Sequence, residues 1–146
     1  LWCVLWSGKY GKSIGISAAI IAVGLWGATQ RPEILIADHG RLIGVLSDQG
    51  RALSKVKGQG FLADVWMEND GMKLDRRDAH DLWQAQNHNI THIWSKKEAA
   101  KTRNCDPDEL IVSQHDVDIL GPCLVLQKQD FYNYGATYIM WTGKAT

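Results

Sequence analysis

The sequence predicts an α/β protein in which one transmembrane helix is followed by a small soluble α/β domain. Two observations lead to this prediction. Residues 13–30 carry no charged side chain and form one mainly apolar stretch. Beyond them, short apolar runs rich in β-branched residues alternate with shorter helical patterns, and such mixing along one chain is typical of layered α/β folds.

The stretch over residues 13–30 has the length of a membrane span. About 18 helical residues at roughly 1.5 Å each reach about 27 Å, close to the ~30 Å hydrocarbon core of a bilayer. Small residues four positions apart, Gly15 with Ala19 and Ala18 with Ala22, would let another membrane helix approach closely. We therefore expect a transmembrane helix here; a buried helix of a soluble α/β protein is the alternative.

The residues before this stretch predict its orientation. Residues 1–6 are wholly apolar, and we expect them to be the end of a preceding membrane helix. Residues 7–12 form a basic loop that carries Lys9 and Lys12, and positively charged loops stay in the cytoplasm. Residues 31–146 are then expected in the periplasm.

The charge balance argues against a protein that binds nucleic acid over its whole surface. The chain has 16 basic and 16 acidic residues and a formal net charge of zero. Nucleic-acid binders of that kind carry a surplus of Lys and Arg. Residues 31–146 have the length of one ordinary domain, without repeats or a low-complexity linker.

The soluble part is expected to begin with an antiparallel meander and to continue as a mixed α/β fold. The meander strands are predicted over 33–38, 41–47 and 51–56. The helix after them is predicted over 61–69, with its inward face formed by Phe61, Leu62, Val65 and Trp66. The remaining predicted elements are a short amphipathic turn within 72–86, a strand over 88–94, a helix over 96–103 capped by Ser95, strands over 109–114 and 123–127, a turn or short helix over 130–134, and a last strand over 136–142.

Two patterns suggest a ligand site, and both are weak. Gly11-Lys12-Ser13 resembles the end of a phosphate-binding loop, but that loop also needs a Gly at the position of Trp6. The aromatic residues of 131–141 lack the interleaved Lys and Arg of a base-stacking platform, so we expect them in the core and on sheet faces.

The five histidines do not predict a metal centre. His88 and His92 lie in a predicted strand, where residues four apart are separated by about 13 Å, too far to share one metal. His80 and His115 each precede an Asp, but neighbours in a strand face opposite ways, so we expect polar surface side chains. We therefore predict no catalytic residue, no cofactor and no metal ligand.

The three cysteines are expected to differ in role. Cys3 lies in the apolar segment and is expected to be an inert buried thiol. Cys105 and Cys123 each lie beside a turn that contains Pro, and an extracytoplasmic compartment would allow a disulfide between them. From these residues alone, a disulfide and two free thiols both remain open.

A family resemblance covers nearly the whole chain. It rests on the segments Pro32–Ile36, Asp38–Leu46, Gly50–Leu53 and Phe61–Gly71, and on a later pattern that contains Cys105, Cys123 and the residues 130–141. In this order the segments resemble the C-terminal region of the ComEC family of competence DNA-internalisation proteins, of the alphaproteobacterial type.

The resemblance implies a part of a bacterial inner-membrane protein through which single-stranded DNA enters the cell during transformation. Many members carry a C-terminal metallo-β-lactamase-like domain with a His-x-His-x-Asp-His metal motif, and this chain has no such motif. The implied fold is therefore a degenerate form of that domain, without metal-dependent nuclease activity.

The implied partners are the remainder of the membrane channel, single-stranded DNA passing through the full-length protein, and other competence proteins. The family-like positions of Cys105 and Cys123 also favour a disulfide. The alternative functions are a diverged metal-dependent hydrolase or nuclease, and a soluble interaction domain with a buried apolar helix.

Overall fold

The computed structural model describes residues 9–28, 30–71, 74–86, 88–101 and 103–140. The chain divides into two compact units, Leu1–Arg31 and Pro32–Thr146. The predicted end of a membrane helix at residues 1–6 lies outside the described residues, as does the end of the last predicted strand.

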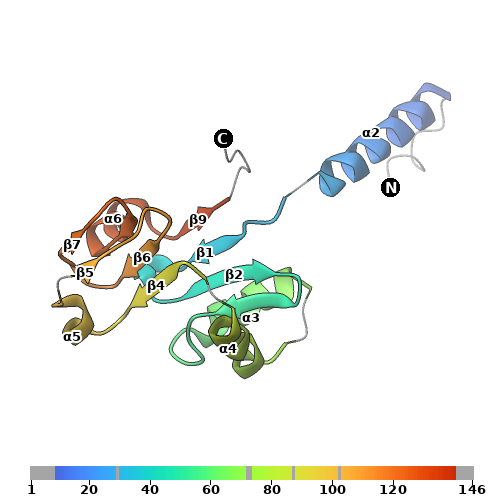
Figure 1. The fold of residues 1–146 in the computed structure, drawn as a ribbon. Coiled ribbons are helices and arrows are strands. Elements are labelled where there is room, and N and C mark those ends of the chain that lie inside the picture. Colours follow the sequence, from blue (N-terminus) through green and yellow to red (C-terminus); the bar gives the residue numbers. More distant parts are fainter. Residues whose placement is uncertain (1–8, 29, 72–73, 87, 102, 141–146) are drawn as a thin grey trace. The chain divides into compact units, whose positions relative to one another are not determined.

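The first unit contains the helix α2, Lys9–Gly27 (Figure 1). The loop predicted over residues 7–12 is thus wrong for residues 9–12, which are helical because no Pro or strong capping residue interrupts the chain there. Among the described residues, no helix is long and apolar enough to cross a membrane. The transmembrane helix predicted over 13–30 is therefore not found; the helix ends at Gly27, and its many Gly, Ala and Ser residues add little apolar character.

The second unit begins with the predicted meander. Its strands are β1 (Ile34–Ile36), β2 (Ile43–Ser47) and β3 (Gly50–Leu53), and the late strand β9 (Thr137–Ile139) pairs with β1. The sheet has the order β3-β2-β1-β9 and is antiparallel throughout. The predicted meander is confirmed, and the pairing of β9 joins the end of the domain to its beginning.

A second sheet is parallel and lies against the first. It contains β4 (Ile90–Ile93), β6 (Leu110–Ser113) and β8 (Leu124–Leu126), in the order β4-β6-β8. The connections between these strands carry the short helix α5 (Lys96–Ala99) and a two-stranded ribbon, β5 (Arg103–Asn104) with β7 (Ile119–Leu120). Parallel neighbours require such crossovers because a tight hairpin cannot join them.

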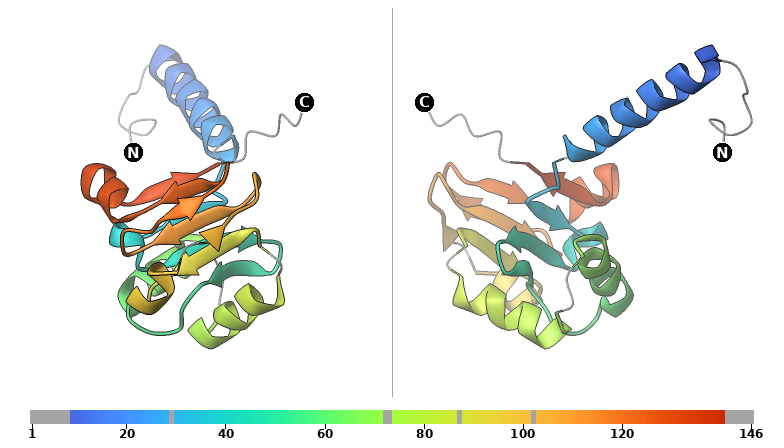
Figure 2. Two further views of the ribbon diagram at one scale, coloured as in Figure 1. Left: turned by 60° about the vertical axis from the view of Figure 1, so that its left-hand side comes forward. Right: turned by 90° about the vertical axis from the view of Figure 1, so that its right-hand side faces the viewer.

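Two helices lie together on one side of the meander sheet (Figures 1 and 2). They are α3 (Gly60–Asn69) and α4 (Arg76–Ala85); the short segment predicted within 72–86 is thus a helix of three turns. The inward face predicted for α3 is partly wrong. Ala63 and Met67 are buried and Phe61 is 85% exposed, because the small Ala63 is the residue that approaches the sheet.

The buried apolar side chains form three clusters. Ile34, Ile36, Ile43 and Val45 of the meander meet Leu110 and Val112 of the parallel sheet, together with Phe131 of α6 (Lys128–Tyr134). A second cluster lies under α3 and α4, and a third lies on the outer face of the parallel sheet. The parallel sheet is consequently covered on both faces, as such sheets usually are.

Candidate functional site

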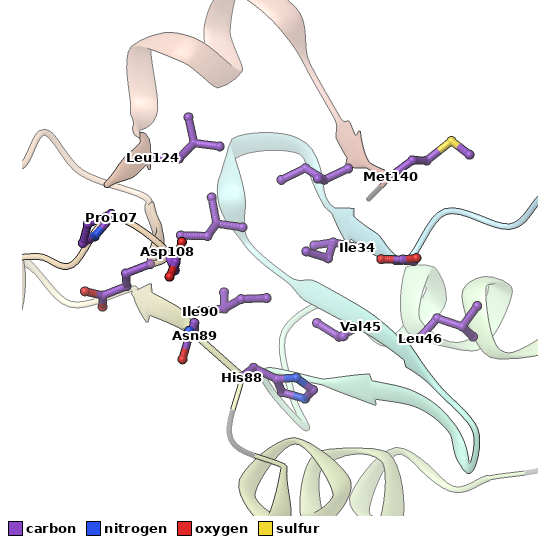
Figure 3. A pocket seen from close by; sticks show the side chains of 14 residues that line it. Ile34, Val45, Leu46, His88, Asn89, Ile90, Pro107, Asp108, Leu124 and Met140 are labelled. Atoms are coloured by element: carbon purple, nitrogen blue, oxygen red, sulfur yellow. The ribbon is translucent and has the colours of Figure 1, made fainter. Parts of the chain in front are cut away.

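A pocket opens at one end of the two sheets (Figure 3). Its volume is about 820 Å³. One wall comes from β1, β2 and the end of β9, and the other from the residues before β4 and β6 and the start of β8. The apolar lining consists of Ile34, Val45, Leu46, Ile90, Leu110, Leu124, Ile139 and Met140.

The polar groups at this pocket are acidic, apart from one imidazole and one amide. Glu33, Asp108 and Glu109 contribute carboxylates, and Glu109 accepts a hydrogen bond from the Thr91 hydroxyl at 2.6 Å. The His88 Nε2 atom is buried without a hydrogen-bond partner, and burial lowers the pKa of this histidine. An apolar floor with a carboxylate rim suits an uncharged or cationic group and disfavours phosphate.

His92 forms the most enclosed polar network of the domain. Its Nε2–H donates to the Gly40 carbonyl at 2.9 Å, so its Nδ1 must accept from the Ser54 hydroxyl, also at 2.9 Å. The Ser54 hydroxyl in turn accepts from the Ile43 backbone N–H at 3.0 Å. This chain of donors and acceptors is complete only when the imidazole is neutral.

His92 lies in a strand, as predicted, and it is only 9% exposed, which the sequence did not indicate. Its burial follows from the position of β4 in a parallel sheet that is covered on both faces. Burial, with Lys55 as a smaller cause, lowers the pKa of His92 to about 4 despite the hydrogen bond to Gly40, which raises it.

The pKa of His92 predicts a stability that falls in mild acid. The folded-state pKa lies below the ordinary value of about 6.5, so the unfolded chain binds more protons between about pH 4 and 6.5. Stability is complete above pH 6.5 and decreases by about 3 kcal/mol as the pH falls through this window. Urea unfolding across the window checks this.

The variant His92→Asn isolates this effect because its side chain does not titrate. It should be less stable than the parent at pH 7 and should lose most of the slope between pH 4 and 6.5. His88→Gln is the matched control and should keep most of that slope. An unchanged slope in His92→Asn would contradict the assignment.

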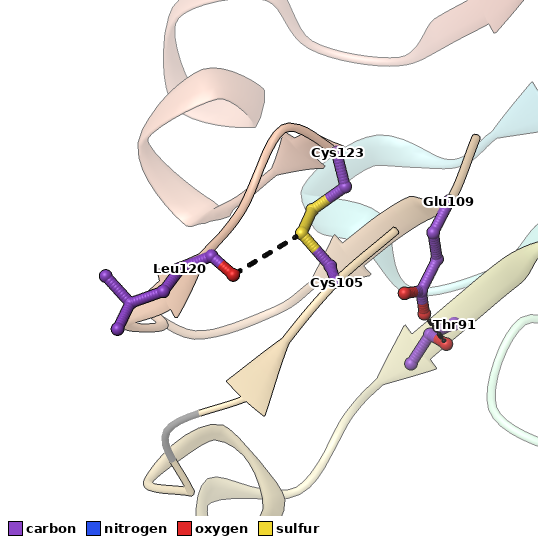
Figure 4. The surroundings of a disulfide bond; sticks show 5 residues. All are labelled: Thr91, Cys105, Glu109, Leu120 and Cys123. Carbon is purple, nitrogen blue, oxygen red and sulfur yellow. Dashed lines mark hydrogen bonds between the residues drawn. A yellow bond between two sulfur atoms is a disulfide. The ribbon is translucent and has the colours of Figure 1, made fainter. Parts of the chain in front are cut away.

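The disulfide joins the crossovers of the parallel sheet (Figure 4). Cys105 and Cys123 are bonded, with their Cα atoms 5.7 Å apart. The bridge links the segment before β6 to the start of β8, which are adjacent strands. Gly121 has a φ of 146°, and a Cβ there would lie 2.6 Å from the Cys105 carbonyl oxygen, so this turn needs glycine to lie against the bridge.

The other histidines singled out in the sequence are not brought together. His80 lies on α4, where its Nδ1–H donates to the Leu53 carbonyl at 3.0 Å and its Nε2 accepts from Gln84 at 3.2 Å. His115 follows β6, and its backbone N–H donates to the Ser113 hydroxyl. Within the described part of the chain, no three His, Cys, Asp or Glu side chains are grouped so that they could hold a metal ion.

The chain matches no protein-family model, no curated protein and no solved structure.

Proposed function

We propose that this chain is the C-terminal, non-catalytic part of a bacterial inner-membrane protein that takes up single-stranded DNA during natural transformation. In this proposal α2 packs against helices of the full-length protein, and the unit from Pro32 onward is a periplasmic domain that supports the channel. The resemblance to the ComEC family suggests this function.

The observation that carries the proposal is the apolar surface of α2. Its large apolar side chains are 58–82% exposed; they are Ile14, Ile16, Ile20, Ile21, Val23, Leu25 and Trp26. At about 100° per residue these positions surround the helix on all sides. A helix that is apolar all round is stable only when other helices or lipid cover it. In the described part of its own unit α2 is the only element, and the proposal assigns its cover to the other helices of the full-length protein.

The disulfide supports the periplasmic location of the domain. Disulfides form and persist in oxidising compartments, the bacterial periplasm among them, and are rare in the cytosol. Descent from a metallo-β-lactamase fold is part of the proposal, and the face-to-face packing of the two sheets, with α3 and α4 outside the first, is compatible with it.

A topology fusion tests the proposal. Alkaline phosphatase fused after Thr146 of the full-length protein is expected to be active, because the enzyme needs the oxidising periplasm for its own disulfides. Deleting the codons for residues 32–146 is expected to lower the transformation frequency by at least tenfold. An inactive fusion with a cytoplasmically labelled C-terminus, or an unchanged transformation frequency, would overturn the proposal.

A further inference from the structure

An open pocket of about 650 Å³ lies on the side of the domain where the loop after β3, the helix α4 and the end of β4 meet. None of its lining residues belongs to the acidic pocket described above. It is lined by Ser54, Lys55, Val56, Lys57, Arg77, His80, Asp81 and Trp94.

Trp94 presents an aromatic surface in this pocket that is already held in place. Its side chain is 48% exposed, although a large aromatic ring gains from burial. The edge of the His92 ring packs against it at a centroid distance of 5.3 Å and an interplanar angle of 77°. Since His92 is itself fixed by Ser54 and Gly40, the indole rests on a rigid support.

The charge around Trp94 is positive. Three cationic side chains, Lys55, Lys57 and Arg77, line the pocket with one carboxylate, that of Asp81. The Lys55 Nζ lies 5.0 Å from the centroid of the Trp94 ring, and burial lowers the pKa of this lysine. Lys57 and Arg77 are exposed, so both are accessible to an anion in solution. In a chain of zero net charge, the pocket is therefore a local concentration of positive charge.

We infer that this pocket binds single-stranded DNA, with a base stacked on the Trp94 ring and the adjoining phosphates paired with Lys57 and Arg77. An exposed aromatic ring beside backbone-binding cations is the arrangement by which proteins hold single strands without sequence preference. The inference rests on the proposed function, because DNA uptake supplies the ligand. An acidic peptide would form ion pairs with the cations but would make no stacking contact with the indole. In duplex DNA the bases are stacked on one another, so no base face is free to stack on Trp94.

The expected geometry also explains the position of Lys55. Its ammonium now lies near the indole, where a cation–π contact stabilises it. A base that stacks on that face displaces the ammonium toward solvent and toward the phosphate of the same nucleotide. On DNA binding, the contact between Lys55 and the Trp94 ring is therefore replaced by two others: a base stacked on the indole, and an ion pair between Lys55 and the phosphate.

Fluorescence anisotropy of a labelled 20-nucleotide oligo-dT with the purified 146-residue chain tests the site. Trp94→Leu is expected to weaken binding about tenfold, and Trp94→Phe to restore most of it, because a base stacks on any aromatic face. Lys57→Gln and Arg77→Gln should each reduce the slope of log K against log salt by about 0.7, as for the loss of one phosphate contact.

Matched controls separate this site from general effects. Phe61→Leu removes another exposed aromatic ring, and Lys101→Gln removes an exposed cation outside the pocket. Both are expected to bind the oligonucleotide as the parent does. Lys57 and Arg77 are exposed, so their variants are expected to fold, and circular dichroism checks this for every variant.

The outcomes distinguish this inference from the proposed function. No binding of oligo-dT, equal loss in the control variants, or effective competition by polyglutamate but not by unlabelled oligo-dT would overturn the DNA site. An active phosphatase fusion together with no oligonucleotide binding would overturn the site alone. Binding that depends on Trp94, together with an inactive fusion, would overturn the proposed topology and leave the site in place.

Discussion

Replacement of Arg51 by Met is expected to lower the free energy of unfolding by about 3–5 kcal/mol, the largest effect of any single substitution considered for this domain. Arg51 is 1% exposed, and its guanidinium forms an ion pair with Asp70, which is 7% exposed. It also donates to the carbonyls of Gly44 at 3.2 Å and Pro32 at 3.3 Å. Met fills most of the same volume, so the loss reports the ion pair with Asp70 and the hydrogen bonds that the Arg51 guanidinium makes.

The exposed pair of Arg76 with Asp64 provides the matched control. Its Nε–Oδ1 distance is 3.1 Å, but the two side chains are 41% and 55% exposed. Arg76→Met should change stability by at most about 1 kcal/mol, because exposed pairs are weak. Urea denaturation measures both variants. The double variant Arg51→Met/Asp70→Leu is expected to be more stable than Arg51→Met, since the buried carboxylate is then removed together with the cation that it pairs with. Equal losses for Arg51→Met and Arg76→Met would contradict the assignment.

Removal of the disulfide is the second large effect. The double variant Cys105→Ala/Cys123→Ala is expected to lose about 3 kcal/mol, because a bridge over a loop of this length restricts the unfolded chain by roughly that amount. Its two residues are 18 positions apart in the sequence. Thermal unfolding should show a Tm lower by roughly 10 °C or more. Reductant should lower the Tm of the parent to a similar extent and leave the double variant unchanged.

The variant Cys3→Ala controls for the loss of any thiol, and it should keep both the Tm of the parent and its sensitivity to reductant. Thiol counting in denaturant without reductant is expected to give one free cysteine in the parent chain. Three free thiols, or a double variant as stable as the parent, would show that the bridge does not form in solution.

Local patterns predicted most of the elements. The meander was predictable because its turns carry Gly and its first two strands carry β-branched residues. Ser95 was recognisable as an N-cap, and it accepts from the Glu98 backbone N–H. A bridge between Cys105 and Cys123 requires neighbouring strands after them, and Leu110 of β6 pairs in parallel with Leu124 of β8.

The face of each element that is buried was not predictable in the same way. The prediction for α3 treated Phe61 as a core residue because it is large and apolar, yet its position in the first turn leaves it in solvent. The burial of His92 was not predicted, because a single strand does not reveal whether a second layer covers it. The pairing of β9 with β1 connects residues about a hundred positions apart, and no local pattern specifies such a partner.

By itself, the sequence determined the order of strands and helices, the separate apolar helix and the pair of cysteines able to form a bridge, because each depends on neighbouring residues and their spacing. Only the tertiary structure decided that Arg51 is buried against Asp70, that His92 is enclosed and neutral, and that Lys57, Arg77 and Trp94 share one pocket. Burial and pairing depend on side chains that come from distant parts of the chain. Their energies arise only when the layers pack together and exclude water.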